Sequence, residues 1–280
     1  MKFYIPELAV ATLLPPQQKL QPKFGGKPWG FPIQQWPGCR ECGTPMALLA
    51  QLPHAPPALV LGDEADVLHL FQCPEGGCSS YDFQAGCTAG MIVKQAELTQ
   101  GLTEAPAPSE NREGIALNGE LWITGWTEQE DGIAESLTEA FFDWEQFDAL
   151  PESIQSFGFE ACRRTKSGSV PLWGGNGIAQ HPPAPFEFLM QVGTSLCLHG
   201  PMPAADAMGC DTRINHAQGD GGHLPVSGNA KKANAPWFAQ QDEGADGFYV
   251  EIANFGSDGT AYVFIDRSTS PPRIAWSWSR

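Results

Sequence analysis

Two close cysteine pairs constrain this 280-residue chain more than any other feature of its sequence. Two residues separate Cys39 from Cys42, and four residues separate Cys73 from Cys78. Four thiolates brought together from such pairs form the tetrahedral ligand set of a structural zinc ion. The spacing therefore predicts a zinc site with all four cysteines as ligands. Gly43, directly after the first pair, permits the tight turn of a zinc knuckle.

Two other interpretations of these cysteines stay open at this point. A thioredoxin-like redox pair would open a helix after a strand, whereas Thr44–Pro45 follows the first pair here. In a secreted protein the eight cysteines could instead form disulfides. The cellular compartment therefore decides between the disulfide interpretation and the metal interpretation. Cys87 could replace one of the four ligands, but we interpret it as a plain buried thiol.

The residues next to the cysteine pairs predict two strands. Met46–Leu52 and Val67–Cys73 are short apolar runs between turn-forming residues. Antiparallel pairing of these strands would bring the two cysteine pairs together. His69 lies within the second run, and we interpret it as a structural side chain because four cysteines already complete a zinc site.

Composition predicts a fold class rich in turns. The chain has 31 Gly and 25 Pro, which implies short elements and few long helices. We expect an α+β protein that is mostly antiparallel β. No apolar stretch is long enough to cross a membrane, and the first residues lack the pattern of a secretion signal, so we expect a cytoplasmic protein.

Negative charge is concentrated in one segment. The formal net charge is −16, which argues against nucleic-acid binding and suits a basic protein partner. Residues 104–160 hold fourteen Asp and Glu and one basic residue, so 14 − 1 = 13 of the excess negative charges lie there. We expect a strand at Leu121–Trp126 and a helix at Ile133–Leu150 with Leu137, Phe141, Trp144 and Phe147 on its apolar face. The alternative for the carboxylates is a merely solvated surface.

The second half of the sequence repeats the first in outline. Lys166–Trp173 is similar to Lys23–Trp29, Phe188–Gln191 to Leu48–Gln51, and Ala261–Asp266 to Val67–Gln72. This order predicts two pseudo-repeated β-rich lobes. We expect a first lobe with the zinc site at 1–103, an acidic linker and helical segment at 104–160, and a second lobe at 161–280 with a long insertion at 192–247.

The insertion supplies a rival to a binding function. Cys197, His199, Cys210, His216 and His223 all fall within it. A second metal site, or the active site of a hydrolase or other enzyme, could be built from them. Their irregular spacing fits no standard signature, and the alternative is an irregular loop.

Four segments of the sequence resemble the YwqG-like family of bacterial proteins, to which no activity is assigned. These segments are Lys23–Trp29, Cys39–Met46, Leu49–Gln51 and Leu70–Cys78. They are also similar to the amino-terminal motif of the programmed cell death protein 2 family, implicated as chaperones for a basic ribosomal protein. The resemblance implies a duplicated, β-rich cytoplasmic protein and supports the four cysteines as metal ligands. It carries over no catalytic residue.

The sequence thus favours a non-catalytic, zinc-stabilised cytoplasmic protein that binds a basic protein partner. The candidate partners are a ribosomal protein, which this chain would hold during assembly as a chaperone does, and a basic toxin, which it would neutralise as an immunity protein does. No membrane or nucleic-acid partner is expected.

Overall fold

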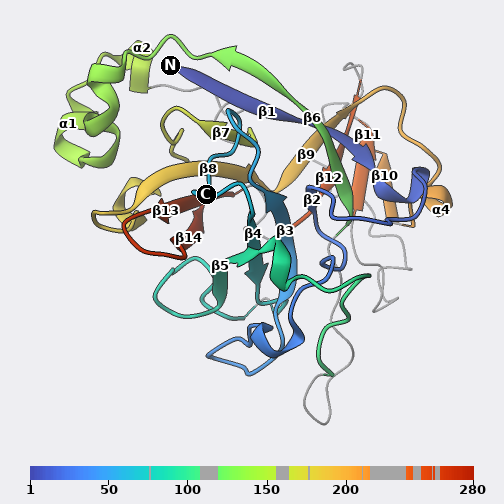
Figure 1. Cartoon of the computed structure of the whole chain (residues 1–280). Helices are drawn as coiled ribbons and strands as arrows, with labels where there is room; N and C mark the ends of the chain where they lie inside the picture. Colours follow the sequence, from blue (N-terminus) through green and yellow to red (C-terminus); the bar gives the residue numbers. More distant parts are fainter. Residues whose placement is uncertain are drawn as a thin grey trace.

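The computed structural model describes residues 1–75, 77–107, 119–155, 164–175, 177–209, 211–214, 238–241, 247–253, 255 and 259–280. Its regular structure is mostly antiparallel β-sheet, and its helices are short (Figure 1). The predicted fold class is confirmed to that extent. None of the described helices is long and apolar enough to span a membrane.

A ten-stranded sheet forms the body of the protein. Across the sheet its strands are β14 (Arg273–Ser279), β13 (Thr260–Asp266), β8 (Glu187–Gly193), β7 (Lys166–Gly168), β1 (Lys2–Val10), β6 (Leu121–Glu130), β2 (Lys23–Phe24), β3 (Ala47–Pro53), β4 (Asp66–Gln72) and β5 (Thr88–Lys94). Strands β1 and β6 pair in the middle. The predicted strand at Leu121–Trp126 is therefore present and extends to Glu130.

The two edge strands of this sheet meet. Thr88 Oγ1 on β5 donates to the carbonyl oxygen of Trp276 on β14 over 3.1 Å. The indole Nε1 of Trp276 donates in turn to the carbonyl oxygen of Ala89 over 3.0 Å. A sheet whose edges are joined in this way is nearly closed and leaves little of either edge exposed.

The strand ladders on the two sides of β1 and β6 follow the same register. The β3–β4 ladder skips Leu49, and the β8–β13 ladder skips Leu189 at the corresponding place. Gln51 of β3 lies opposite Lys23 of β2, and Gln191 of β8 lies opposite Lys166 of β7. Both lysines and both glutamines are buried.

Each of these glutamines fastens an irregular segment to the sheet. Gln51 Oε1 accepts a hydrogen bond from the backbone N–H of Trp29 over 2.7 Å, and its Nε2 donates to a carbonyl oxygen just before β2. Gln191 Oε1 accepts from the N–H of Leu172 over 2.9 Å, and its Nε2 donates to a carbonyl oxygen just before β7. Buried main-chain groups outside the ladders are thereby satisfied.

Two left-handed residues follow each buried lysine. They are Gly25 and Gly26 after β2, each with φ of 65°, and Gly168 and Ser169 at the end of β7, with φ of 78° and 56°. Glycine adopts this conformation without strain, whereas serine does not. The hydroxyl of Ser169 donates to Asp131 Oδ2, which helps hold the strained residue in place.

A four-stranded sheet packs against the ten-stranded sheet and shares a hydrophobic core with it. Across the sheet its strands are β10 (Asp211–Ile214), β11 (Phe238–Gln241), β12 (Gly247–Glu251) and β9 (Ser195–His199). Leu198 and Val250 of this sheet share one buried cluster with Leu68 of the ten-stranded sheet. Strands therefore occur within the predicted insertion 192–247. The predicted boundaries of the three segments stay predictions.

The described helices are short. The α-helices are α1 (Trp144–Asp148), α2 (Glu152–Gln155) and α4 (Ala205–Met208). The 3-10 helices are η1 (Ala11–Leu13), η2 (Ile33–Gln35), η3 (Gln95–Glu97), η4 (Glu135–Phe142) and η5 (Gly177–Gln180).

The prediction of a single helix over Ile133–Leu150 is wrong. Asp143 lies between η4 and α1 in an extended conformation, and its side chain accepts a hydrogen bond from Gln146 N, which caps a new helix. Phe141 and Phe147 pack against each other at 5.5 Å, as the apolar spacing suggests. Trp144, however, is 58% exposed and belongs to no apolar face.

Candidate metal centre

The first cysteine pair lies on a tight turn. The N–H of Gly43 donates to the carbonyl oxygen of Cys39 over 2.8 Å, and the N–H of Cys39 donates to the carbonyl oxygen of Thr44 over 2.9 Å. Gly43 has a φ of 73°, which favours glycine. The turn brings Cys39 and Cys42 to the same side, as the Cys-x2-Cys spacing predicts.

The second pair reaches this turn because β3 and β4 are antiparallel neighbours. Ala47 at the start of β3 lies opposite Gln72 at the end of β4. The chain before β3 and the chain after β4 therefore emerge at the same end of the ladder. This pairing, predicted from the sequence, places Cys73 beside the turn.

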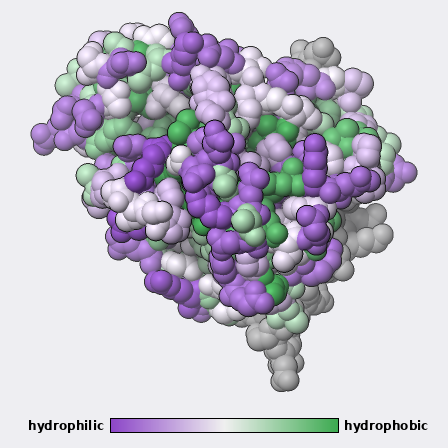
Figure 2. All heavy atoms as spheres, viewed as in Figure 1, coloured by the Kyte–Doolittle hydropathy of each residue, from purple (hydrophilic) through white to green (hydrophobic). Residues whose placement is uncertain are grey.

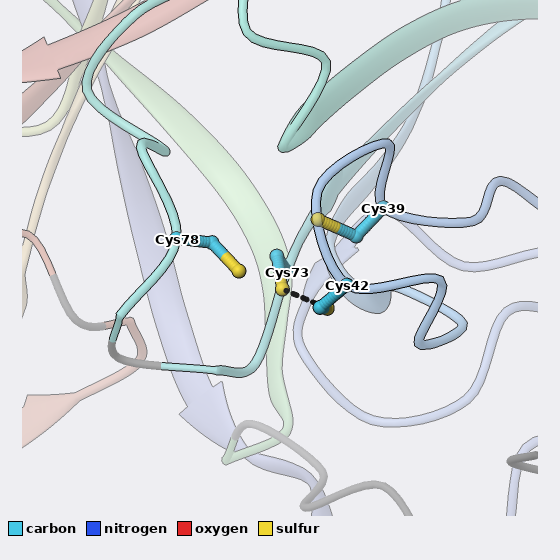
Figure 3. Close-up of side chains that lie close together, drawn as sticks. All are labelled: Cys39, Cys42, Cys73 and Cys78. Atoms are coloured by element: carbon cyan, nitrogen blue, oxygen red, sulfur yellow. Dashed lines mark hydrogen bonds between the residues drawn. The ribbon is translucent and has the colours of Figure 1, made fainter.

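The four sulfurs converge (Figure 3). All four Sγ atoms, from Cys39, Cys42, Cys73 and Cys78, lie within 4.8 Å of one another. The Sγ atoms of Cys42 and Cys73 are 3.6 Å apart. A tetrahedral ion about 2.3 Å from each sulfur would separate the sulfurs by about 3.8 Å. The arrangement therefore fits a metal ion without a rearrangement of the backbone.

The charge state of the thiols also suits a cation. Burial by itself would raise the pKa of Cys42, but hydrogen bonds from Thr44 and the neighbouring cysteines lower it to about 6. Burial raises the pKa of Cys78 to about 11 and that of Cys73 as well. Cys42 can thus supply a thiolate near neutral pH, and a bound cation would favour the thiolate forms of Cys73 and Cys78.

An aromatic layer supports the cluster. Phe31, Trp36 and Phe71 pack edge to face, with ring centroids between 5.1 and 5.8 Å apart. The indole Nε1 of Trp36 donates to the carbonyl oxygen of Met46 over 3.0 Å, which fixes the segment between the first cysteine pair and β3. The sulfurs of Cys39 and Cys73 are buried against this layer.

His69 lies near the cluster and belongs to its support. Its side chain is fully buried, and its ring centroid lies 4.8 Å from that of Phe31. Burial lowers the pKa of His69 to about 3, so the ring is neutral at pH 7. It is not a member of the group of converging sulfurs, which agrees with a structural role.

Two further groups lie at this place, and sequence reasoning missed Glu41 and ranked Cys87 below the four ligands. Cys87, interpreted as a plain buried thiol, has its Sγ 3.6 Å from that of Cys39. Glu41 lies between the first two cysteines in sequence, and its carboxylate approaches Cys78 and Cys87. The only sequence signal for them is their proximity to the pairs along the chain.

The described part of the insertion does not form a second centre. Cys197 and His199 are exposed on β9, and no group of three metal-ligating side chains in the described residues includes them. Cys210, His216 and His223 lie outside the described residues.

Comparisons with protein-family models, with curated proteins and with solved structures found no match to this chain.

Proposed function

We propose that this chain is a non-catalytic cytoplasmic binding protein, stabilised by one structural zinc ion, whose partner is a basic polypeptide. The observation that carries the binding function is Trp144, a large aromatic side chain that is 58% exposed among carboxylates. The observation that favours a structural metal is the set of four converging sulfurs, because four protein ligands leave a tetrahedral ion no position for a substrate.

Zinc is the ion that the ligand set favours. Thiolates are soft ligands, and four of them in a tetrahedral arrangement are typical of structural zinc. The Gly43 turn and the second cysteine pair at the end of β4 are consistent with a zinc knuckle. The resemblance of Cys39–Met46 to the YwqG-like family also supports these cysteines as ligands.

Trp144 lies in a segment of the chain that is rich in exposed carboxylates, which we call the acidic face. We use this name for the exposed carboxylates of β6, η4, α1 and α2, which are Glu128, Glu130, Glu135, Glu139, Asp143, Glu145, Asp148 and Glu152. Residues 119–155 contain no Lys or Arg. Lys2 forms an ion pair with Glu128 at 2.6 Å at one end of this face. Figure 2 shows hydrophilic residues, mixed with pale and hydrophobic ones, over the region of α1 and α2.

An exposed indole in such a field suits a cationic partner. A Lys or Arg of the partner would gain both a carboxylate and the face of the Trp144 ring. Trp and Arg are also the residues that contribute most to the binding energy of protein interfaces. Carboxylates around the indole would raise the rate of encounter and make it sensitive to salt.

Binding of an Arg- and Lys-rich synthetic peptide tests this function. Quenching of tryptophan fluorescence should report binding at low salt that weakens at physiological salt. Trp144→Ala should weaken binding by on the order of tenfold or more. Tyr81→Ala is the matched control, because Tyr81 is also exposed, at 50%, and lies outside the acidic face. Equal binding by both variants, or binding that does not change with salt, would contradict the proposal.

We also propose that the two sides of the ten-stranded sheet are copies of one ancestral unit. Each side has a buried lysine, two left-handed residues and a glutamine that binds main-chain groups. The skipped residues Leu49 and Leu189 occur at the same place in both ladders. This supports the two pseudo-repeated lobes expected from the sequence, with the cysteine pairs present in the first lobe alone.

A further inference from the structure

Cys87 and Glu41 are not needed for a zinc ion that four cysteines already surround. The Sγ of Cys87 nevertheless lies 3.6 Å from that of Cys39. One ligand atom each from Glu41, Cys78 and Cys87 lie within 4.8 Å of one another. Three potential metal ligands thus converge beside the four sulfurs of the first centre.

We infer that Glu41, Cys78 and Cys87 form a second metal site, which adjoins the first and shares the Cys78 thiolate with it. This inference goes beyond the proposed function, which requires one ion. The ligand of the second site is a thiophilic divalent cation of the zinc class, because two sulfurs and one carboxylate oxygen provide a borderline soft ligand set.

The backbone holds these three side chains together independently of any ion. The N–H of Ser79 donates to Glu41 Oε2 over 3.1 Å, which fixes the carboxylate beside the loop that carries Cys78. The N–H of Arg40 donates to the carbonyl oxygen of Gly86 over 3.0 Å. That bond ties the first cysteine turn to the residue before Cys87.

A second bond fixes Cys87 relative to the first site. The N–H of Cys73 donates to the carbonyl oxygen of Cys87 over 2.9 Å. Cys87 is also fully buried in the same apolar cluster as Cys39 and Cys73. Its sulfur therefore cannot turn to solvent, and it stays directed at the thiolates of the first site.

A shared thiolate makes the two sites compatible. A thiolate sulfur has more than one lone pair, so Cys78 can bind one ion on each side. The two ions then partly neutralise five thiolates and a carboxylate that would otherwise repel one another.

The two sites differ in coordination. The first has four protein ligands and is closed, whereas the second has three and keeps a fourth position for water or another small ligand. Glu41 is exposed and Cys78 is half-buried, so solvent can reach the second site. The second ion should therefore exchange faster than the first and be removed first by a chelator.

Metal titration of the reduced, metal-free protein with Co²⁺ tests this site. The thiolate-to-cobalt charge-transfer absorption should rise in two steps. Cys87→Ser and Glu41→Gln should each weaken the second step, by on the order of tenfold or more, and leave the first unchanged. Cys197→Ser is the control, because Cys197 lies exposed on β9.

The Glu41→Gln variant should fold normally, because this side chain is exposed and glutamine keeps an oxygen that can accept the hydrogen bond from the N–H of Ser79. Loss of the second step in this variant therefore cannot be attributed to misfolding. Cadmium NMR gives a second measurement, in which two coupled resonances indicate a shared thiolate. A single step in the wild type, or two steps that persist in the Cys87→Ser and Glu41→Gln double variant, would overturn the second site. Either result would leave the proposed binding function untouched.

Discussion

The two sides of the ten-stranded sheet share a strand register but differ in what covers them. On one side Phe71 lies opposite Leu48, and both belong to the cluster that contains the cysteines. On the other side Phe264 lies opposite Phe188, and this pair packs with Trp173. One loop region is therefore suited to being held by metal coordination and the other by buried aromatic area. The same β framework tolerates either solution.

The polar anchors differ accordingly. Tyr262 lies opposite Gln191, and its hydroxyl accepts from the N–H of Gly174 over 2.6 Å and donates to the carbonyl oxygen of Leu172 over 3.1 Å. His69 occupies the corresponding position opposite Gln51. The tyrosine hydroxyl reaches past the sheet to fasten a loop, whereas the shorter imidazole packs within the aromatic layer. The cysteines provide the fastening that His69 does not.

The largest expected effect comes from removing one of the four converging cysteines on the β3–β4 side of the sheet. Cys73→Ser should abolish binding of the structural ion and lower the free energy of unfolding by several kcal/mol, since structural zinc contributes on the order of 10 kcal/mol to small metal-dependent folds. Metal analysis and thermal unfolding measure both effects. A chelator should lower the melting temperature of the wild type by more than that of the variant.

Cys197→Ser supplies the control for that experiment. It should keep its metal and lie within about 0.5 kcal/mol of the wild type, because Cys197 is exposed on β9. Full metal content in Cys73→Ser would show that this cysteine is not a ligand.

Loss of an aromatic ring on the side of the sheet that contains Trp173 should destabilise the protein without release of metal. Trp173→Ala should destabilise the protein by about 3–5 kcal/mol, because a buried aromatic ring leaves a cavity. It also removes the hydrogen bond from Nε1 to the carbonyl oxygen of Phe141, which spans 2.7 Å. Denaturant unfolding measures the loss, and metal analysis should give the wild-type value. Release of the ion would mean that the two sides are not independent.

Replacement of either buried glutamine should destabilise the protein by a similar amount, which tests the equivalence of the two sides of the sheet. Gln51→Leu and Gln191→Leu each leave two main-chain groups without their side-chain partner, at a cost of about 2–4 kcal/mol. Denaturant unfolding of both variants should give values that agree within about 1 kcal/mol. A large effect at one glutamine and none at the other would contradict the equivalence of the two sides.

The two buried lysines should differ in their response to pH. Burial lowers the pKa of Lys166 from 10.5 to about 8, and its ammonium group contacts carbonyl oxygens and the rings of Phe3 and Phe188. Between pH 8 and 10.5 the unfolded chain therefore binds more protons at this group than the folded protein, and stability rises with pH. The rise is at most about 3 kcal/mol.

Lys166→Met should remove that rise, as measured by denaturant unfolding at several pH values. Lys23 differs because Glu120 Oε1 lies 2.9 Å from its ammonium group and opposes the effect of burial. A wild-type rise that persists unchanged in Lys166→Met would assign the pH dependence to other groups.

Local patterns predicted much of the first side of the sheet. The strands around Leu48 and His69, their antiparallel pairing and the convergence of four cysteines all follow from apolar runs, turn residues and ligand spacing. Such features depend on neighbours in the sequence. The spacing of Cys87 gave no warning of its contact with Cys39, because that contact depends on the path of the loop between them.

Features that depend on contacts between residues far apart in the sequence could not be predicted. No strand is predicted from the sequence in residues 1–22, yet β1 is a central strand, with Pro6 opposite Trp126. A proline inside a strand normally argues against a central position, but β1 pairs with β7 only at Phe3 and Tyr4, so Pro6 lies beyond that ladder. The joining of β5 to β14 could not be predicted either, since it depends on the curvature of the whole sheet.

That joining has a consequence for the synthesis of the chain. The contacts between Thr88 and Trp276 link a strand near the beginning to the last strand. A chain emerging from the ribosome can form β3, β4 and β5 early, but the free edge of β5 stays uncovered until Arg273–Ser279 has been made. Unpaired strand edges promote aggregation, so the nascent protein is vulnerable until β14 has been made and covers β5.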